Sequence, residues 1–294
     1  MRILNFGSLN IDKTYHVDHL VLPGETISSD SLAVNCGGKG LNQSIALARA
    51  GTSVMHAGKI GADGGFLLDA LREAGVDTSL VRIDPEIPTG HAIIQVEKRG
   101  QNSIILFPGA NGAIDASDIT RVLSEFGRGD VLLLQNEISG MEEMISLAHE
   151  KGMYIILNPS PLDTRLMKCA LQWVDLFILN EIEGQMLSGE ECPEKILDAL
   201  LASYPAARIV LTLGENGAWY ADRTHRAFQE PFRCAVVDTT AAGDTFTGYF
   251  LASFLADDSP ENAMLRAAKA ASLAIGKRGA SASIPMKHEV DAAF

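Results

Sequence analysis

Short apolar segments alternate with stretches of helical periodicity along most of the chain. We predict a buried strand at each apolar segment, because turn-forming residues bound them. These segments are Ile3–Gly7, Ser53–Ala57, Val131–Gln135, Tyr154–Asn158, Leu176–Asn180 and Ile209–Leu213. Helices are predicted between most of them, for example at Gly40–Ala50, Gly64–Ala74, Met141–Lys151 and Pro193–Ser203. The alternation predicts a three-layer α/β/α fold around a mainly parallel sheet that is covered on both faces.

Two regions interrupt this alternation. Tyr15–Asn35 and Thr89–Phe107 have a period of two and contain turn sequences such as Pro23-Gly24. Hairpins, rather than strand–helix–strand units, are typical of that pattern. We therefore expect one domain over residues 1–294, with lid segments at about residues 13–36 and 89–108 that form a small β-sheet lid.

Composition and charge narrow the class of protein. Hydrophobic residues make up 47% of the chain and charged residues 21%, which permits a large core and argues against disorder. The net charge of -13 argues against a nucleic-acid partner, which would favour a basic face. No apolar run has membrane-spanning length, no signal-peptide pattern is present, and the four cysteines have no metal or redox spacing. We expect a cytoplasmic enzyme with no membrane partner.

The run Asp238–Gly248 carries the strongest chemical signal. Small residues lead into a helical pattern, and Asp244 lies in its first turn. A helix N-terminus offers free N–H groups and the positive end of the helix dipole, which attract phosphate. A carboxylate beside them can accept a proton from an alcohol. The run therefore suggests phosphoryl transfer to a hydroxyl group.

Other polar residues stand at predicted strand ends or helix starts, and each has two interpretations. Gly37–Gln43 is either a turn before a helix or a place where the backbone approaches a ligand. Asn10 and Asp12 either form a turn or bind sugar hydroxyls. Asn180 and Glu183 fit a capping box, and they also fit an indirect role in binding magnesium.

Taken together, these motifs resemble the ribokinase family of carbohydrate kinases. Gly37–Asn42 is similar to the first signature of that family, and Asp238–Asp244 is similar to the second. The order of the remaining pieces also matches, namely Asn10-x-Asp12, Glu137, Asn180-x-x-Glu183 and Thr212-x-Gly214-x-x-Gly217. The resemblance spans essentially the whole chain.

The resemblance implies ATP-dependent phosphorylation of the 5-hydroxyl of a sugar. By position, Asp244 would be the catalytic base, and the anion hole for the γ-phosphate would be formed by Ala241, Ala242 and Gly243. The sugar would be held by Asn10, Asp12, Gly38, Lys39, Asn42, Glu137 and Asp244. ATP would lie along Asn180, Thr212, Gly214, Gly217 and Gly243. Glu183 would organise Mg²⁺ through water.

Members of this family also resemble one another in a loop that binds an activating monovalent cation. By position, potassium would be bound by Asp238, Thr240, Ala274, Lys277, Gly279 and Ser283. The helix segment Ala267–Ala271 lacks the Asn or His that many relatives place near adenine. The family likeness further implies a homodimer that forms through the lid.

D-ribose is the substrate that the set of sugar-facing residues favours, because several hydroxyl-binding groups surround the predicted site. Deoxyribose, fructose, a related sugar or a nucleoside stay open as alternatives. A function of another class is a catalytically silent sugar-binding protein. Asp244 and the intact run before it argue against that class.

Overall fold

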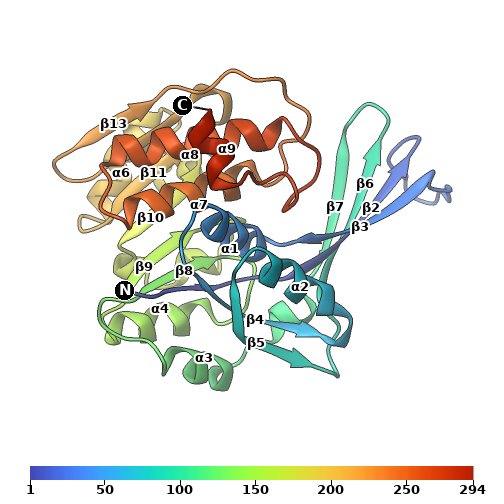
Figure 1. Ribbon diagram of the computed structural model, residues 1–294, viewed down its shortest axis with the longest axis horizontal. Helices are drawn as coiled ribbons and strands as arrows, with labels where there is room; N and C mark the ends of the chain where they lie inside the picture. The colour runs from blue at the N-terminus through green and yellow to red at the C-terminus, as the bar shows by residue number, and fades with distance from the viewer. Residues whose placement is uncertain (294) are drawn as a thin grey trace.

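A mainly parallel nine-stranded sheet forms the centre of the protein (Figure 1). The computed structural model describes residues 1–293. The strands are β1 (Ile3–Phe6), β4 (Met55–Gly61), β5 (Asp77–Asp84), β8 (Val131–Gln135), β9 (Tyr154–Asn158), β10 (Leu176–Asn180), β11 (Arg208–Thr212), β12 (Ala218–Ala221) and β13 (Arg226–Gln229). Their order is β13-β12-β11-β10-β9-β8-β1-β4-β5, with β12 and β13 antiparallel. The predicted fold class is confirmed.

Helices cover both faces of this sheet. One hydrophobic core lies under α1 (Lys39–Arg49), α2 (Gly65–Glu73), α7 (Ala242–Phe254), α8 (Pro260–Ile275) and α9 (Lys287–Ala292). The other lies under α3 (Ala116–Leu123), α4 (Met141–Glu150), α5 (Glu181–Ser188) and α6 (Pro193–Ser203). Within residues 1–293, no helix has both the length and the apolar character needed to cross a membrane.

Successive residues of each central strand alternate between the two cores. Ile3 packs in the first core and Leu4 in the second, as the period of two requires. The apolar runs that predicted the strands are continuous because both faces of each strand are buried. The polar Asn5 and Gln135 interrupt such runs, and both are fully buried.

A second sheet of four strands projects from the body as the lid (Figure 1). It consists of β2 (Asn10–Val17), β3 (Ser31–Gly37), β6 (Gly90–Glu97) and β7 (Asn102–Phe107). The order is β3-β2-β6-β7, in which the two hairpins join through a parallel pairing of β2 with β6. The two interruptions in the sequence pattern therefore meet in one separate sheet.

One predicted strand is misplaced. The prediction of Ser53–Ala57 ends early, since β4 runs from Met55 to Gly61. Lys59 reads as a polar residue near a turn, yet its side chain is buried and forms an ion pair with Asp118 at 2.6 Å. Its Nζ also donates to the carbonyl of Ala113 at 2.6 Å. These partners allow a charged residue to continue a buried strand.

Candidate active site

The first turns of α1 and α7 meet beyond the carboxyl ends of the parallel strands. Asp244, in the first turn of α7, is 7% exposed and faces two side-chain amides from the N-terminal half of α1. Asn42 Nδ2 donates to Asp244 Oδ2 at 3.0 Å, and Gln43 Nε2 donates to Oδ1 at 2.9 Å. Both carboxylate oxygens are thus held by neutral donors. Gln43 was not among the predicted site residues.

A close contact between the two helices sets this arrangement. A Cβ atom placed on Gly248 would lie 2.3 Å from Ala46 Cβ and 2.8 Å from the Ala46 carbonyl carbon. Gly248 follows Asp244 by one helical turn, and Ala46 follows Asn42 by one turn. Because neither helix has a bulky side chain at the crossing, the two N-terminal turns come within hydrogen-bonding distance.

The run before Asp244 forms a bare helix N-terminus. Ala241 occupies the N-cap position of α7 with a φ of 59°, and no side chain caps the helix. Such a start leaves amide groups of the first turn available to an anion. The N–H of Ala242, however, donates to Thr239 O at 3.2 Å, so a phosphate would have to share or replace that hydrogen bond. Gly243 follows with open space around its Cα.

Two carboxyl groups lie in the predicted sugar region. Glu137, just after β8, accepts from Ser8 Oγ at 2.5 Å and from the N–H of Lys39 at 2.9 Å. Burial raises the pKa of Glu137. Burial, together with the charge of Glu137, raises the pKa of Asp12 to about 7. Burial would lower the pKa of Lys39, but the surrounding carboxylates, with Asp244 first among them, raise it.

The start of the lid strand β2 also contributes to this region. Asn10, predicted to hold sugar, accepts at Oδ1 from Asn111 Nδ2 at 2.8 Å. Asn111 also exchanges hydrogen bonds with the backbone of Leu9, at 3.0 and 3.1 Å. A Cβ on Gly37 would lie 2.1 Å from Asp12 Oδ2, so only glycine fits beside that carboxylate. The predicted Gly38 is the N-cap of α1, with a φ of 95°.

Asn111 and Gly37 contact the predicted sugar residues Asn10 and Asp12 but were not themselves predicted as site residues. Asn111 stands in a stretch of small residues that reads as a turn. Gly37 belongs to the glycine cluster, but a cluster alone does not say which glycine faces a side chain. The sequence therefore contained a signal for Gly37, the glycine cluster, but none that singled out Asn111.

The proposed magnesium pair forms the capping box that its spacing also predicts. Asn180 Oδ1 accepts from the N–H of Glu183 at 2.9 Å, and Glu183 Oε2 accepts from the N–H of Asn180 at 3.1 Å. Asn180 Nδ2 donates to Glu183 Oε1 at 2.9 Å as well. Within residues 1–293, no group of three or more His, Cys, Asp or Glu side chains could bind a metal ion.

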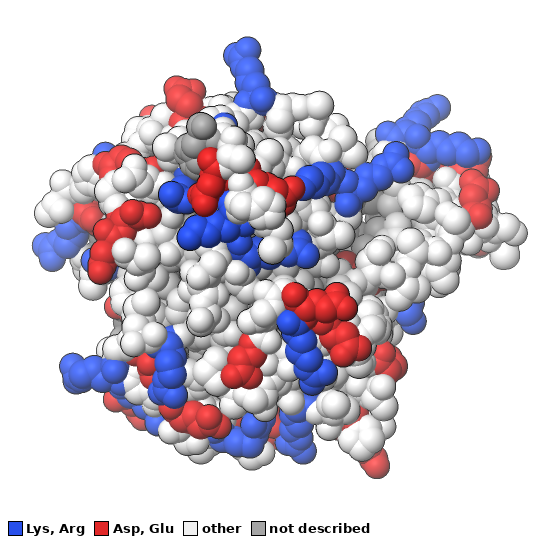
Figure 2. All heavy atoms as spheres, in the orientation of Figure 1, with Lys and Arg blue, Asp and Glu red and all other residues white. Residues whose placement is uncertain are grey.

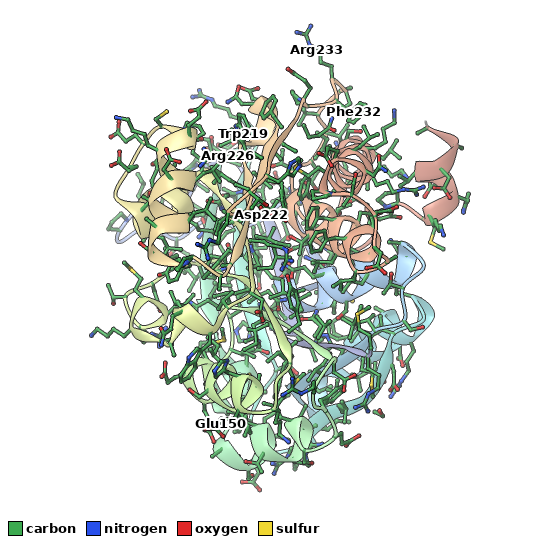
Figure 3. All side chains as sticks on the ribbon, turned by 90° about the vertical axis from the view of Figure 1, so that its left-hand side faces the viewer. Glu150, Trp219, Asp222, Arg226, Phe232 and Arg233 are labelled. Atoms are coloured by element: carbon green, nitrogen blue, oxygen red, sulfur yellow. The ribbon has the colours of Figure 1, made fainter. Side chains whose placement is uncertain are left out.

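The predicted nucleotide loop lies between β11 and β12. Thr212 ends β11, and a short 3₁₀ turn at Gly214–Asn216 follows, with φ values of 57° at Gly214 and 93° at Gly217. Phe232, labelled in Figure 3, lies in the segment that leads from β13 to α7. Lys269 Nζ on α8 lies 4.5 Å from the centre of its ring. The ring of Phe232 thus contacts Lys269, which lies within the helix segment Ala267–Ala271 that lacks the expected Asn or His.

The two halves of the predicted cation loop are joined by Asp238. Its Oδ1 accepts from the N–H and Oγ1 of Thr240, at 2.9 and 2.6 Å, and its Oδ2 accepts from the N–H of Gly279 at 2.9 Å. Burial alone would raise the pKa of Asp238, but these hydrogen bonds lower it. The side chain of Lys277 is paired with Glu289 at 2.8 Å.

The other predicted cation residues can contribute backbone carbonyls. Ala274 and Ser283 are both buried, and Ser283 Oγ donates to the carbonyl of Ala280 at 2.9 Å. Arg49 Nη1 braces the same segment, since it donates to the carbonyls of Ser281 and Ile284 at 2.8 and 2.6 Å. Arg49 on α1 and Glu289 on α9 thus both hold the second half of the loop.

A pocket of about 680 Å³ extends from the sugar region between the lid and the body. It shares Asn10 and Glu137 with the sugar region, but Asp244 does not line it. Its far walls are mostly apolar and include Leu106, Ile138 and Leu166.

Comparisons with known proteins agree with this geometry. The sequence profile of the pfkB family of carbohydrate kinases matches residues 2–287. The chain is 33% identical over 291 residues to the ribokinase of Haemophilus influenzae, which covers 96% of this chain and 95% of that protein.

Solved structures show the same similarity. The ribokinase of Cryptococcus neoformans var. grubii in complex with ADP has a TM-score of 0.87 and 32% identity, over 100% of this chain and 99% of the other. The ribokinase of Arabidopsis thaliana complexed with ribose and ATP has a TM-score of 0.87 and 30% identity, over 99% and 98% of the two chains.

Proposed function

The chain belongs to the pfkB family of carbohydrate kinases, and we propose that it transfers the γ-phosphoryl group of ATP to the 5-hydroxyl of D-ribose. The observation that carries this proposal is Asp244, held by two amides at a bare helix N-terminus. The similarity over almost the whole chain to ribokinases, one of them complexed with ribose and ATP, supports this choice of substrate.

In the proposed reaction, the sugar oxygen attacks the γ-phosphorus as the bond from that phosphorus to the bridging oxygen of ADP breaks. Asp244 accepts the hydroxyl proton as the phosphoryl group arrives, because a sugar alcohol is a far weaker acid than a carboxylic acid. The backbone N–H groups of Ala241, Ala242 and Gly243 would stabilise the negative charge of the transferring group by hydrogen bonds. The products are ribose 5-phosphate and ADP.

We propose that Mg²⁺ takes part, bound mainly by the nucleotide phosphates. When bound, it would neutralise charge on the phosphates, which matters in a chain with a net charge of -13. The buried carboxylate of Glu183 already accepts from Asn180, so it suits a contact through water better than direct ligation. Asn180, Thr212, Gly214 and Gly217 would lie along the nucleotide.

An assay of ADP release with purified protein, ATP and a panel of sugars tests the proposed function. We expect ribose-dependent ADP formation, with deoxyribose and fructose as weaker substrates, and ³¹P NMR of the product should identify a 5-phosphate. ATP turnover that ribose does not stimulate would overturn the assignment. Ribose binding without turnover would favour the silent sugar-binding protein.

The pocket beside the sugar region favours a nucleoside as the second candidate substrate. A volume of about 680 Å³ falls within the range of sites for drug-sized ligands. A pentose with its primary hydroxyl at Asp244 would present its opposite end toward Asn10 and Glu137, where the pocket begins. A panel that includes adenosine, inosine and uridine decides between the two, since a nucleoside kinase should have a higher kcat/KM for at least one of them than for ribose.

The pH dependence of sugar binding should follow Asp12. Its carboxyl has a pKa of about 7, so it is largely neutral at pH 6 and largely ionised at pH 8. A carboxylate accepts hydrogen bonds from sugar hydroxyls more strongly than a neutral acid does. We therefore expect the KM for ribose to fall as the pH rises from 6 to 8, measured by initial rates at saturating ATP. In Asp12→Asn this slope should disappear; an unchanged slope would contradict the role of Asp12.

The same group makes the protein without sugar less stable as the pH rises. Because the folded pKa of Asp12 lies above its ordinary value of 3.8, its contribution to stability is present at low pH and lost through about pH 7. The loss falls between about pH 4 and pH 7, so thermal melts at pH 5 and 7 should show it, and Asp12→Asn should reduce the difference.

We propose that K⁺ activates the enzyme through the loop that contains Asp238, Thr240, Ala274, Lys277, Gly279 and Ser283. The hydrogen bonds from Asp238 to Thr240 and Gly279 support this proposal, because they bring together two segments rich in backbone carbonyls. We expect kcat/KM to be several-fold higher in potassium chloride than in the chloride of a large organic cation at equal ionic strength. Equal values in the two salts would count against the proposal.

We propose a homodimer that forms through the lid. The cross-strand registers place four exposed apolar side chains on the same face of the lid sheet, namely Leu32, Val34, Ile105 and Phe107. The lid surface in Figure 2 carries few charged atoms between its tip and the body. A second lid would cover these four exposed apolar side chains, which share the face with Lys13, Tyr15 and Gln95. Sedimentation velocity at micromolar concentration should give a dimer, and Val34→Lys with Ile105→Lys should give a monomer; a monomeric unmodified protein would refute it.

A further inference from the structure

A chain of buried amide side chains lies behind Asp244. Asn5 on β1, Gln135 on β8 and Gln43 on α1 are each fully buried. Gln135 Nε2 donates to Asn5 Oδ1 at 3.0 Å and to Gln43 Oε1 at 2.7 Å. The chain ends at Asp244, to which Gln43 Nε2 donates at 2.9 Å. It therefore connects β1 and β8, which are neighbours in the central sheet, to Asp244, the proposed base.

One end of this chain fixes the orientation of every amide in it. Asn5 Nδ2 donates to the backbone carbonyl of Gly40 at 2.8 Å, and a carbonyl can only accept. The oxygen of Asn5 must therefore face Gln135, which must offer its NH₂ group. Gln135 in turn requires the oxygen of Gln43 on its side, so the NH₂ group of Gln43 is directed to Asp244.

A second backbone carbonyl gives the same orientation independently. Asn158 Nδ2 donates to the carbonyl of Ile178 at 2.7 Å, which leaves Asn158 Oδ1 as an acceptor. Gln43 Nε2 lies 3.2 Å from that oxygen. The backbone carbonyls of Gly40 and Ile178 thus both require the nitrogen of Gln43 to lie on the side of Asp244. Reversal of the Gln43 amide would place its oxygen against Asp244 Oδ1 and Asn158 Oδ1, and its nitrogen against the nitrogen of Gln135.

We infer that Gln43 is a positioning residue for Asp244, oriented by Asn5, Gln135 and Asn158. Its donor holds Oδ1 while Asn42 holds Oδ2, so the plane of the carboxylate is fixed before a sugar arrives. This inference rests on the proposed role of Asp244 as the proton acceptor. Gln43 acts only through Asp244 and does not take part in proton transfer itself.

Kinetics of Gln43→Met test the inference, because methionine keeps the length of the side chain and removes the donor. We expect kcat for ribose to fall about tenfold or more while the KM for ribose stays within about twofold. In Gln43→Glu, two carboxyl groups would face each other, so the acid limb of the kcat profile should move to higher pH. A merely structural role would not move that limb.

A double-mutant cycle tests the chain behind Gln43. Gln135→Met alone should lower kcat, since the Gln43 amide loses one of the two partners that orient it and keeps only Asn158. In the Gln43→Met background, Gln135→Met should lower kcat no further. Additive losses in kcat would overturn the part assigned to Gln135.

Ser44→Ala is the matched control. Ser44 is fully buried in the same network and accepts from Asn5 Nδ2 at 2.8 Å, but Asn5 stays fixed by Gly40 without it. Its kcat should stay within about twofold of the unmodified protein. A Gln43→Met enzyme with unchanged kcat, or one no slower than Ser44→Ala, would overturn the inference.

The proposed function is tested separately by Asp244→Asn. If that variant turns over ribose normally, the proposed base is wrong whatever Gln43 does. If it is inactive while Gln43→Met is fully active, only the positioning role fails.

Discussion

Replacement of Asp244 by alanine is expected to lower kcat for ribose by at least about a hundredfold, because a general base contributes at least that much. Asp244 is the only carboxylate in the first turn of α7, and Asn42 and Gln43, which surround it, offer donors that cannot accept a proton. Sugar binding should be largely kept, since Asp12 and Glu137 lie outside this turn. Steady-state kinetics and ribose titration by calorimetry measure the two effects.

A control is needed for the loss of one negative charge. Asp258→Ala removes an exposed carboxylate beyond the other end of α7 and should leave kcat unchanged. Near-normal turnover in Asp244→Ala would show that another group accepts the proton. A large loss of ribose affinity would instead show that Asp244 mainly binds the sugar.

Gly248→Ala should have the second-largest effect. The added methyl group would meet Ala46 Cβ at 2.3 Å and the Ala46 carbonyl carbon at 2.8 Å, so α7 must move away from α1. A shift of about 1 Å in a catalytic group can cost about a hundredfold in rate. We expect a fall in kcat of that order together with a lower Tm, measured by kinetics and thermal unfolding.

Two further variants separate this effect from a general sensitivity to Gly→Ala changes. Gly65→Ala places a methyl group in open space at the start of α2 and should leave both kcat and Tm unchanged or slightly improved. Ala46→Gly in the Gly248→Ala chain removes the nearest clashing atom and should restore part of the activity. A Gly248→Ala enzyme with normal kcat would mean that the contact does not set the position of Asp244.

The central strands could be predicted from the sequence because burial on both faces leaves an unbroken apolar run. Val131–Gln135, Tyr154–Asn158 and Leu176–Asn180 were predicted with the bounds that the structure has. The edge strand β5 and the short β13 were not predicted, because many of their residues are exposed and break the pattern. A local hydrophobic pattern reflects how the residues are buried, and edge strands bury few of their residues.

From the residues alone, the proposed site was predictable where its residues lie near one another in the sequence, whereas isolated residues such as Glu137 were placed in it by the family resemblance. The glycine-rich start of α1 and the run at Asp244 could be recognised as motifs. Asn5, Gln135 and Asn111 could not, because their roles depend on partners far away in the chain. The available signal was a polar residue inside an apolar strand, as in Asn5 and Gln135. Such a residue needs a buried hydrogen-bond partner, but the amino-acid sequence does not say which residue that partner is.

The strand β2 has a consequence for the design of chimeric enzymes. It begins at the buried Asn10, carries Asp12 beside Gly37 of the neighbouring strand, and continues into the lid. The same strand therefore supplies two of the groups that we propose for substrate recognition and also forms part of the lid sheet. A lid cannot be exchanged as an interchangeable module without exchanging the recognition groups as well. A graft that keeps substrate preference would need to carry β2, β3, β6 and β7 together with Asn111, which fixes where that strand starts.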